Sequence, residues 1–157
     1  MLTEQVARGL GGDVSATMAV VCQNVSTDLG GKLTLHELTD QLAAHTFPSG
    51  TQRLYAVFAL CRESPGLLIA NRVEVVSRDG EVVALMEFPA VSFKPDQLTQ
   101  RIVANLAGIV WPAPGAYTVR FVSRGVPVAS VPVLLVQLAP IAAPQVMPIS
   151  DGDGRGD

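Results

Sequence analysis

The sequence predicts an all-β protein with a single β-sandwich, of immunoglobulin-like or jelly-roll-like type and about seven to eight strands. Composition is the first reason: hydrophobic residues make up 48% of the chain but aromatics only 5% and charges 16%, so burial depends on aliphatic residues in many short elements. The second reason is the stretch Ala113–Leu138, which has the pattern of one long β-hairpin. Alternate residues from Tyr117 to Phe121 line one face, and Arg124-Gly125 supplies a tight turn.

Length and local composition predict one domain with two appendages. A chain of 157 residues is long enough for one two-layer core and too short for two such cores with linkers. We expect a short N-terminal arm at residues 1–13, the β-sandwich at 14–138, and a flexible tail rich in Pro, Gly and Asp at 139–157.

Charge and hydropathy define the expected partners and compartment. The net charge of −3 and the scattered positions of the 11 Lys and Arg residues predict that nucleic acid is not a partner. No run of about 18 uncharged apolar residues occurs, so no membrane partner is expected. Met1–Asp13 does not have the pattern of a signal peptide, which predicts a cytoplasmic protein in which Cys22 and Cys61 are reduced, buried thiols.

The first half of the chain begins with clear strands and then becomes ambiguous. Apolar alternation predicts a strand over Ala16–Val25 and another over Lys32–Leu38. The leucines at 35, 38 and 42 also fit a helical turn, but we expect a strand followed by an irregular crossing segment that ends at Phe47-Pro48. Gln52–Cys61 is apolar on both faces and is therefore expected to be a central strand.

A hairpin is predicted in the middle of the chain. Ile69–Ser77 and Glu81–Phe88 both alternate, and the intervening Arg78-Asp79-Gly80 favours a type I′ turn. Residues 96–107 leave two alternatives: a short helix capped by Asp96, or a strand. We expect a strand over about Gln100–Ala107, because β-branched residues occupy its centre.

The last strand, Val126–Leu138, is the predicted interaction edge. Pro127 and Pro132 cannot donate to a β-ladder, so the strand is expected to lie at a sheet edge or to carry a bulge near Ala129-Ser130. An uncharged edge needs a cover, which is either a second copy of the chain or the N-terminal arm. We therefore expect a homo-oligomer whose contact includes five residues: Val131, Val133, Leu134, Leu135 and Val136.

Several local motifs resemble a family of small bacterial proteins known only as a domain of unknown function. The motifs are Gly31-Lys32-Leu33-Thr34-Leu35 leading to Phe47-Pro48, then Asp79-Gly80, then Gly115-Ala116-Tyr117 before a terminal hairpin. The resemblance implies a single β-sandwich over about Ala16–Leu138 and brings no catalytic residue with it. A Gly-x-Tyr entering a penultimate strand is also common in immunoglobulin-like sandwiches, where the tyrosine packs at a corner between sheets.

No catalytic, cofactor-binding or metal-binding residue is predicted. The local cluster of His36, Glu37, Asp40 and His45 has metal-type side chains but lacks His-Glu-x-x-His spacing, so we interpret it as a solvated crossing segment and leave metal binding as the alternative. No Gly-x-Ser-x-Gly elbow surrounds any serine, and no phosphate-binding glycine loop occurs. We expect no cofactor and no enzymatic activity.

These observations favour a non-enzymatic sandwich that acts through protein contact, as a structural or assembly subunit or an adaptor in a bacterium or bacterial virus. The alternative is a sandwich that binds carbohydrate or another small ligand, for which Tyr55, Trp111 and Tyr117 are the available aromatic platforms. An enzyme of unknown type is the third hypothesis.

Overall fold

The computed structural model describes residues 14–51, 53–140 and 144. Within these residues, the regular secondary structure consists entirely of β-strands. The all-β prediction is confirmed. One main sheet has the strand order β10 (Thr99–Asn105), β5 (Tyr55–Arg62), β1 (Val14–Thr27), β2 (Leu33–Leu38). The other has the order β3 (Gln41–Ala44), β13 (Val126–Gln137), β12 (Gly115–Ser123), β7 (Asn71–Ser77), β8 (Val82–Phe88). Two short pairs complete the described strands: β11 (Val110–Trp111) with β4 (Ser49–Gly50), and β6 (Gly66–Leu68) with β9 (Val91–Phe93).

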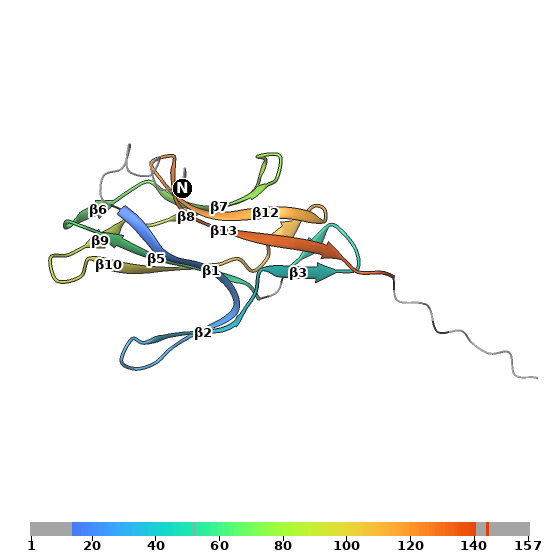
Figure 1. Cartoon of the computed structure of the whole chain (residues 1–157), viewed down its shortest axis with the longest axis horizontal. Helices are drawn as coiled ribbons and strands as arrows, with labels where there is room; N and C mark the ends of the chain where they lie inside the picture. Colours follow the sequence, from blue (N-terminus) through green and yellow to red (C-terminus); the bar gives the residue numbers. More distant parts are fainter. Residues whose placement is uncertain (1–13, 52, 141–143, 145–157) are drawn as a thin grey trace, which may run out of the picture.

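The two main sheets form two layers around one apolar core (Figure 1). Side chains alternate across each strand, so Val119 and Phe121 of β12 enter the core while Arg120 between them points to the outer face. Phe58 of β5 and Phe121 meet across the layers with ring centroids 6.0 Å apart, and both are fully buried. Burial of each such side chain contributes about 1.5–3 kcal/mol, which makes this face the main source of stability.

The interior strand β5 behaves as its sequence predicts. It lies between β10 and β1, and residues from Ala56 to Leu60 are buried on both of its faces. A strand with two hydrogen-bonded neighbours and two covered faces needs apolar residues at every position. The continuous apolar run is therefore explained by position in the sheet.

The predicted hairpin over β7 and β8 is present, but the predicted type of its turn is wrong. The amide of Gly80 donates to the Ser77 carbonyl at 3.0 Å, and the φ of Gly80 is +87° while Asp79 keeps a negative φ. A type I′ turn needs positive φ at both central residues, so this connection is a type I turn followed by a left-handed glycine. Residues Arg124 and Gly125 have φ of 49° and 76° between the paired Ser123 and Val126, so the type I′ turn joins β12 to β13 instead.

Both helix alternatives are wrong. Residues 99–105 form β10, which pairs along its whole length with β5, as the strand interpretation expected. The segment after β2 crosses to the other sheet, where β3 runs parallel to β13. Pairing with the edge of an existing sheet satisfies the backbone hydrogen-bonding groups of residues 41–44. The segment is therefore a strand, although the spacing of the leucines at 35, 38 and 42 also fits a helix.

The last strand is only partly an edge, which corrects the sequence prediction. Residues Leu134–Gln137 pair with β3, and the Leu134 amide donates to the Asp40 carbonyl at 2.8 Å. The predicted bulge is present, since the register with β12 shifts between Phe121 and Val122. The expected arm at 1–13 lies outside the described residues, as does the tail at 139–157 except for 139, 140 and 144.

Candidate functional site

A two-stranded projection is the first feature without a role in the core. Strand β1 pairs with β5 only as far as Cys22, and beyond that residue it pairs with β2 alone. We call residues 23–38 the β1–β2 arm, which extends beyond the rest of its sheet (Figure 1). Two-stranded ribbons without a packed face are marginally stable in water. The arm would therefore be stabilised by burying its surface against another chain or segment.

The two faces of the arm differ in chemistry. Val25 lies opposite Leu35 and Thr27 lies opposite Leu33, which places Val25, Leu33 and Leu35 on one face. These three side chains are half-buried, and none belongs to the core or packs against it. At the tip, Leu29 is fully exposed. The other face is polar, and the Ser26 hydroxyl lies 3.0 Å from His36 Nε2.

A shallow groove of about 290 Å³ opens at the base of the arm. Val20 and Val21 of β1, Leu38 of β2 and Val131 of β13 line it, together with Asp40. Leu38 is 63% exposed here. The groove therefore lies at the junction between the two sheets, since its lining comes from β1, β2 and β13.

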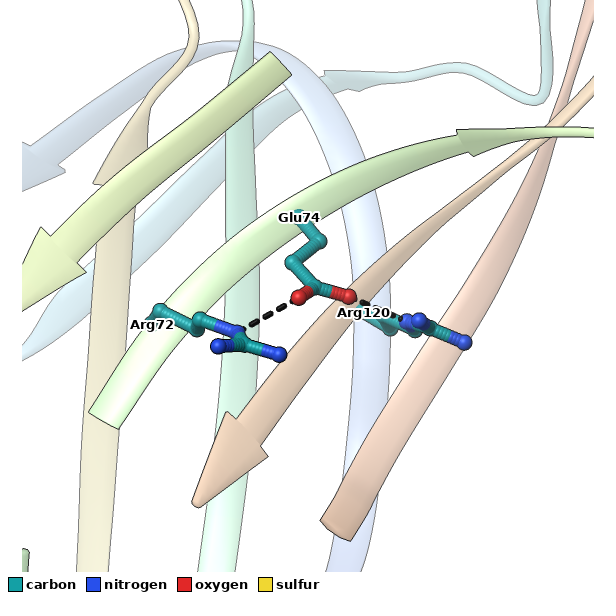
Figure 2. A network of polar contacts seen from close by, with 3 residues as sticks. All are labelled: Arg72, Glu74 and Arg120. Atoms are coloured by element: carbon teal, nitrogen blue, oxygen red, sulfur yellow. Dashed lines mark hydrogen bonds and ion pairs between the residues drawn. The ribbon is translucent and has the colours of Figure 1, made fainter. Parts of the chain in front are cut away.

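The second feature lies on the outer face of the other sheet. Glu74 of β7 is directly opposite Arg120 of β12, and Arg72 precedes it by two residues on the same face. The Glu74 side chain is 2% exposed; Arg120 Nε lies 2.7 Å from Oε2 and Arg72 Nε lies 2.5 Å from Oε1 (Figure 2). A buried carboxylate is tolerated when both oxygens are paired in this way.

The residues of the predicted interaction edge point in different directions. Val133 and Leu135 are buried in the core, whereas Leu134 is 44% exposed on the outer face. Val131 and Val136 are half-buried, and Val131 lines the groove at the base of the arm. Strand β3 covers the edge at residues 134–137 and leaves the first part of β13 at the sheet edge, so self-association through this strand stays a prediction.

The predicted metal-type cluster does not converge. His36 contacts Ser26 on the polar face of the arm, and His45 Nδ1 lies 3.1 Å from the carbonyl oxygen of Ala139. Glu37 lies beside His36 with a φ of 56°, and Asp40 uses its backbone carbonyl to pair with β13. In the described ranges, no three His, Cys, Asp or Glu side chains lie close enough together to hold a metal ion.

Both cysteines are free thiols, as the sequence predicts, although only Cys22 is fully buried. Cys22 lies opposite Tyr55 at one end of β5, while Cys61 lies opposite Ser15 at the other end. Six residues of strand separate the two positions by about 20 Å, which excludes a disulfide between them. Burial raises the pKa of the Cys22 thiol above its ordinary value, partly offset by a backbone hydrogen bond from Asn24.

The aromatic side chains are unsuited to act as ligand platforms. Trp111 is completely buried and Tyr117 is 5% exposed, because the two rings pack edge to face with centroids 5.1 Å apart. Of the three predicted platforms Tyr55, Trp111 and Tyr117, only Tyr55 keeps partial exposure. Neither the arm face nor the arginine pair was found by sequence reasoning; the available signals were the Val25, Leu33 and Leu35 alternation and the i, i+2 spacing of Arg72 and Glu74.

Comparison with solved structures finds this fold in a larger protein. The "Pseudomonas fluorescens alkylpurine DNA glycosylase AlkC bound to DNA containing an abasic site analog" is similar with a TM-score of 0.50 and 15% sequence identity, over 84% of this chain. The chain spans about a third of the length of that protein, namely 33%. At this identity the likeness shows the fold alone. No curated protein sequence matches the chain.

This likeness corrects the prediction that nucleic acid is not a partner. The same fold occurs within a DNA-bound protein, so net charge does not exclude nucleic acid for this chain. On the outer sheet face the fold brings Arg72 and Arg120 together although they are far apart in sequence, so net charge does not describe the local distribution of cations. Contact with phosphates depends on how cations cluster in space, and the positions of Lys and Arg in the sequence do not reveal this clustering. In the described part of the chain, no helix is long and apolar enough to span a membrane.

The family is settled by the extent of the sequence match. Residues 17–136 match the "Family of unknown function (DUF6941)", and this range runs from within β1 to the last residue but one of β13. The match covers both main sheets and the whole β1–β2 arm, in agreement with the resemblance that the local motifs indicated. The chain belongs to this family of unknown function, DUF6941.

Proposed function

We propose that this chain is a non-enzymatic contact module that binds a different protein through the β1–β2 arm. One observation carries the proposal: Val25, Leu33 and Leu35 form a half-buried apolar face that lies outside the apolar core of the described residues. Apolar surface of this kind normally marks an interaction site in a soluble protein. Because Cys22 and Cys61 are free thiols, we place this contact in the cytoplasm.

The backbone of the arm defines the chemistry of the partner. Strand β2 is the last strand of its sheet, and in the described residues its outer edge has no ladder partner. From Leu33 to His36 this edge carries no charged side chain that would oppose pairing. The partner therefore contributes an extended segment that pairs with β2 as an additional strand. Its apolar side chains contact the face formed by Val25, Leu33 and Leu35.

The test uses two pairs of leucines. A photo-crosslinking residue at position 33 identifies the partner, which is then purified and titrated against the wild type. The variant Leu33→Thr/Leu35→Thr removes the apolar face and retains strand propensity. The control Leu67→Thr/Leu85→Thr changes leucines that are 58% and 52% exposed elsewhere on the molecule.

We expect the arm variant to weaken binding by about tenfold or more, which corresponds to about 1.4 kcal/mol. The control variant should bind within about twofold of the wild type, because its leucines lie outside the proposed contact. Equal binding by the arm variant would contradict the proposal, and so would a crosslink formed only to another copy of this chain.

A further inference from the structure

We propose that Arg72 and Arg120, held in place by Glu74, bind a phosphate group on the outer face of the β7–β12 pair. This site is on the opposite sheet from the β1–β2 arm and is independent of the protein contact proposed above. It uses side chains of two central strands, which are more rigid than loops as supports for a binding site.

The buried carboxylate orients the two guanidinium groups. Each oxygen of Glu74 contacts one arginine through its Nε atom: Oε2 with Arg120 at 2.7 Å and Oε1 with Arg72 at 2.5 Å. Val76 and Val122 on the same face are almost fully buried and limit the access of water to the group. An ion pair in such a setting is stronger than one at an open surface.

The contacts with Glu74 leave the terminal nitrogens of both arginines available. In the described residues no hydrogen bond is formed by Nη1 or Nη2 of either side chain. The two side chains remain 39% and 32% exposed, and Figure 2 shows the dashed contacts reaching one nitrogen of each. Two planar groups with free donors match the oxygens of a phosphate.

The charge balance also favours an anion. Arg72 and Arg120 both pair with the Glu74 carboxylate, so these three side chains together carry a net positive charge. Glu87 lies opposite Arg72 on β8, but it is exposed and forms no ion pair with it among the described residues. Arg124, in the turn after β12, adds a cation near the end of the sheet at which Arg72 lies. With Arg124 and Glu87 included, three arginines and two glutamates give this part of the sheet a net charge of +1.

Two sources could supply the phosphate: the backbone of a nucleic acid, or a free phosphate or small phosphorylated molecule. The experiment titrates the full chain with a fluorescent single-stranded oligonucleotide and, separately, with inorganic phosphate. Saturable oligonucleotide binding that phosphate displaces supports the site with a nucleic-acid source. Binding of phosphate without the oligonucleotide supports the site with a small-molecule source.

The decisive variant is Glu74→Gln/Arg120→Gln, which keeps the net charge of the wild type and leaves no unpaired buried carboxylate. We expect at least about a tenfold loss of affinity, because one guanidinium and the orienting carboxylate are both removed. Arg72→Lys keeps the charge but loses the planar fork, and we expect a loss of about threefold or more. Arg101→Gln changes an exposed arginine on β10 and should bind within about twofold of the wild type.

Three results would overturn the proposal. One is the absence of binding by both probes up to about 10 mM phosphate, above the range of a weak site. Another is wild-type affinity in the Glu74→Gln/Arg120→Gln variant. The third is an acidic peptide that binds as tightly as the oligonucleotide at the same ionic strength, which would assign the cluster to a protein carboxylate instead.

Discussion

The hydroxyl of Tyr117 donates a hydrogen bond to the carbonyl oxygen of Ala113 at 2.6 Å, and the Ala113 amide donates back to the same hydroxyl at 3.3 Å. This pair of bonds closes the loop between β11 and β12. The ring of Tyr117 also packs edge to face on Trp111 at an interplanar angle of 76°. The tyrosine thus joins a loop to the core, as in the corner of immunoglobulin-like sandwiches.

The variant Tyr117→Phe should therefore lower the free energy of unfolding by about 1–2 kcal/mol, because it leaves two backbone groups of Ala113 without their partner. Urea denaturation measures the change. Tyr55→Phe is the matched control: no hydrogen bond from its hydroxyl occurs among the described residues, and its effect should stay below about 0.5 kcal/mol. Equal effects of the two substitutions would show that the corner bonds contribute nothing.

The two hairpin turns should respond differently to asparagine. Arg124 has a φ of 49°, in the left-handed region that asparagine tolerates better than arginine, so Arg124→Asn should stabilise the protein by about 0.5–1 kcal/mol. Asp79 has no such φ, and Asp79→Asn should be neutral within about 0.5 kcal/mol. Thermal unfolding compares the two. Stabilisation by Asp79→Asn alone would contradict the assigned turn types.

The two thiols should differ in reactivity. Cys22 is fully buried with a raised pKa, whereas Cys61 is half-buried, so an alkylating reagent at neutral pH should modify Cys61 first and Cys22 only on unfolding. Mass spectrometry of timed samples measures both rates. Faster labelling of Cys22 in the native protein would contradict its placement.

The same pKa shift has a stability consequence. Burial raises the pKa of Cys22 in the folded state above its value in the unfolded state. The contribution of Cys22 to the free energy of unfolding is therefore fully present below about pH 8.5, and it declines at higher pH because the thiol of the unfolded chain ionises first. The difference in stability between the wild type and Cys22→Ala should therefore shrink at alkaline pH. A constant difference from pH 7 to 10 would be inconsistent with the raised pKa.

The β1–β2 arm should contribute little to the stability of the isolated chain. Leu35 packs outside the core, and Leu35→Ala should cost less than about 1 kcal/mol. Leu60, in the centre of β5, is completely buried, and Leu60→Ala should cost about 2–5 kcal/mol. Chemical denaturation of both variants provides the comparison. Similar losses would mean that the arm belongs to the folded core.

The sequence by itself determined the fold class, the strand β5 at the centre of a sheet, and both long hairpins. These features follow from alternation along a strand and from turns between neighbouring strands, which are properties of residues close together in the chain. The hydrogen bond from Tyr117 belongs to the same group, since its partner lies four residues away.

Only the tertiary structure decided the features that bear on function. Strand β3 covers the end of β13 although some ninety residues separate them, as in the bond from the Leu138 amide to the Ala44 carbonyl, and parallel pairing at such a distance leaves no local pattern. Glu74 and Arg120 are likewise brought together across β7 and β12, where register selects which charges share a face. The apolar residues of the β1–β2 arm alternate like those of any half-buried strand. Whether a second layer covers these apolar residues depends on where the rest of the chain packs. In this fold, the second sheet packs on β1 and β5 but not on the arm.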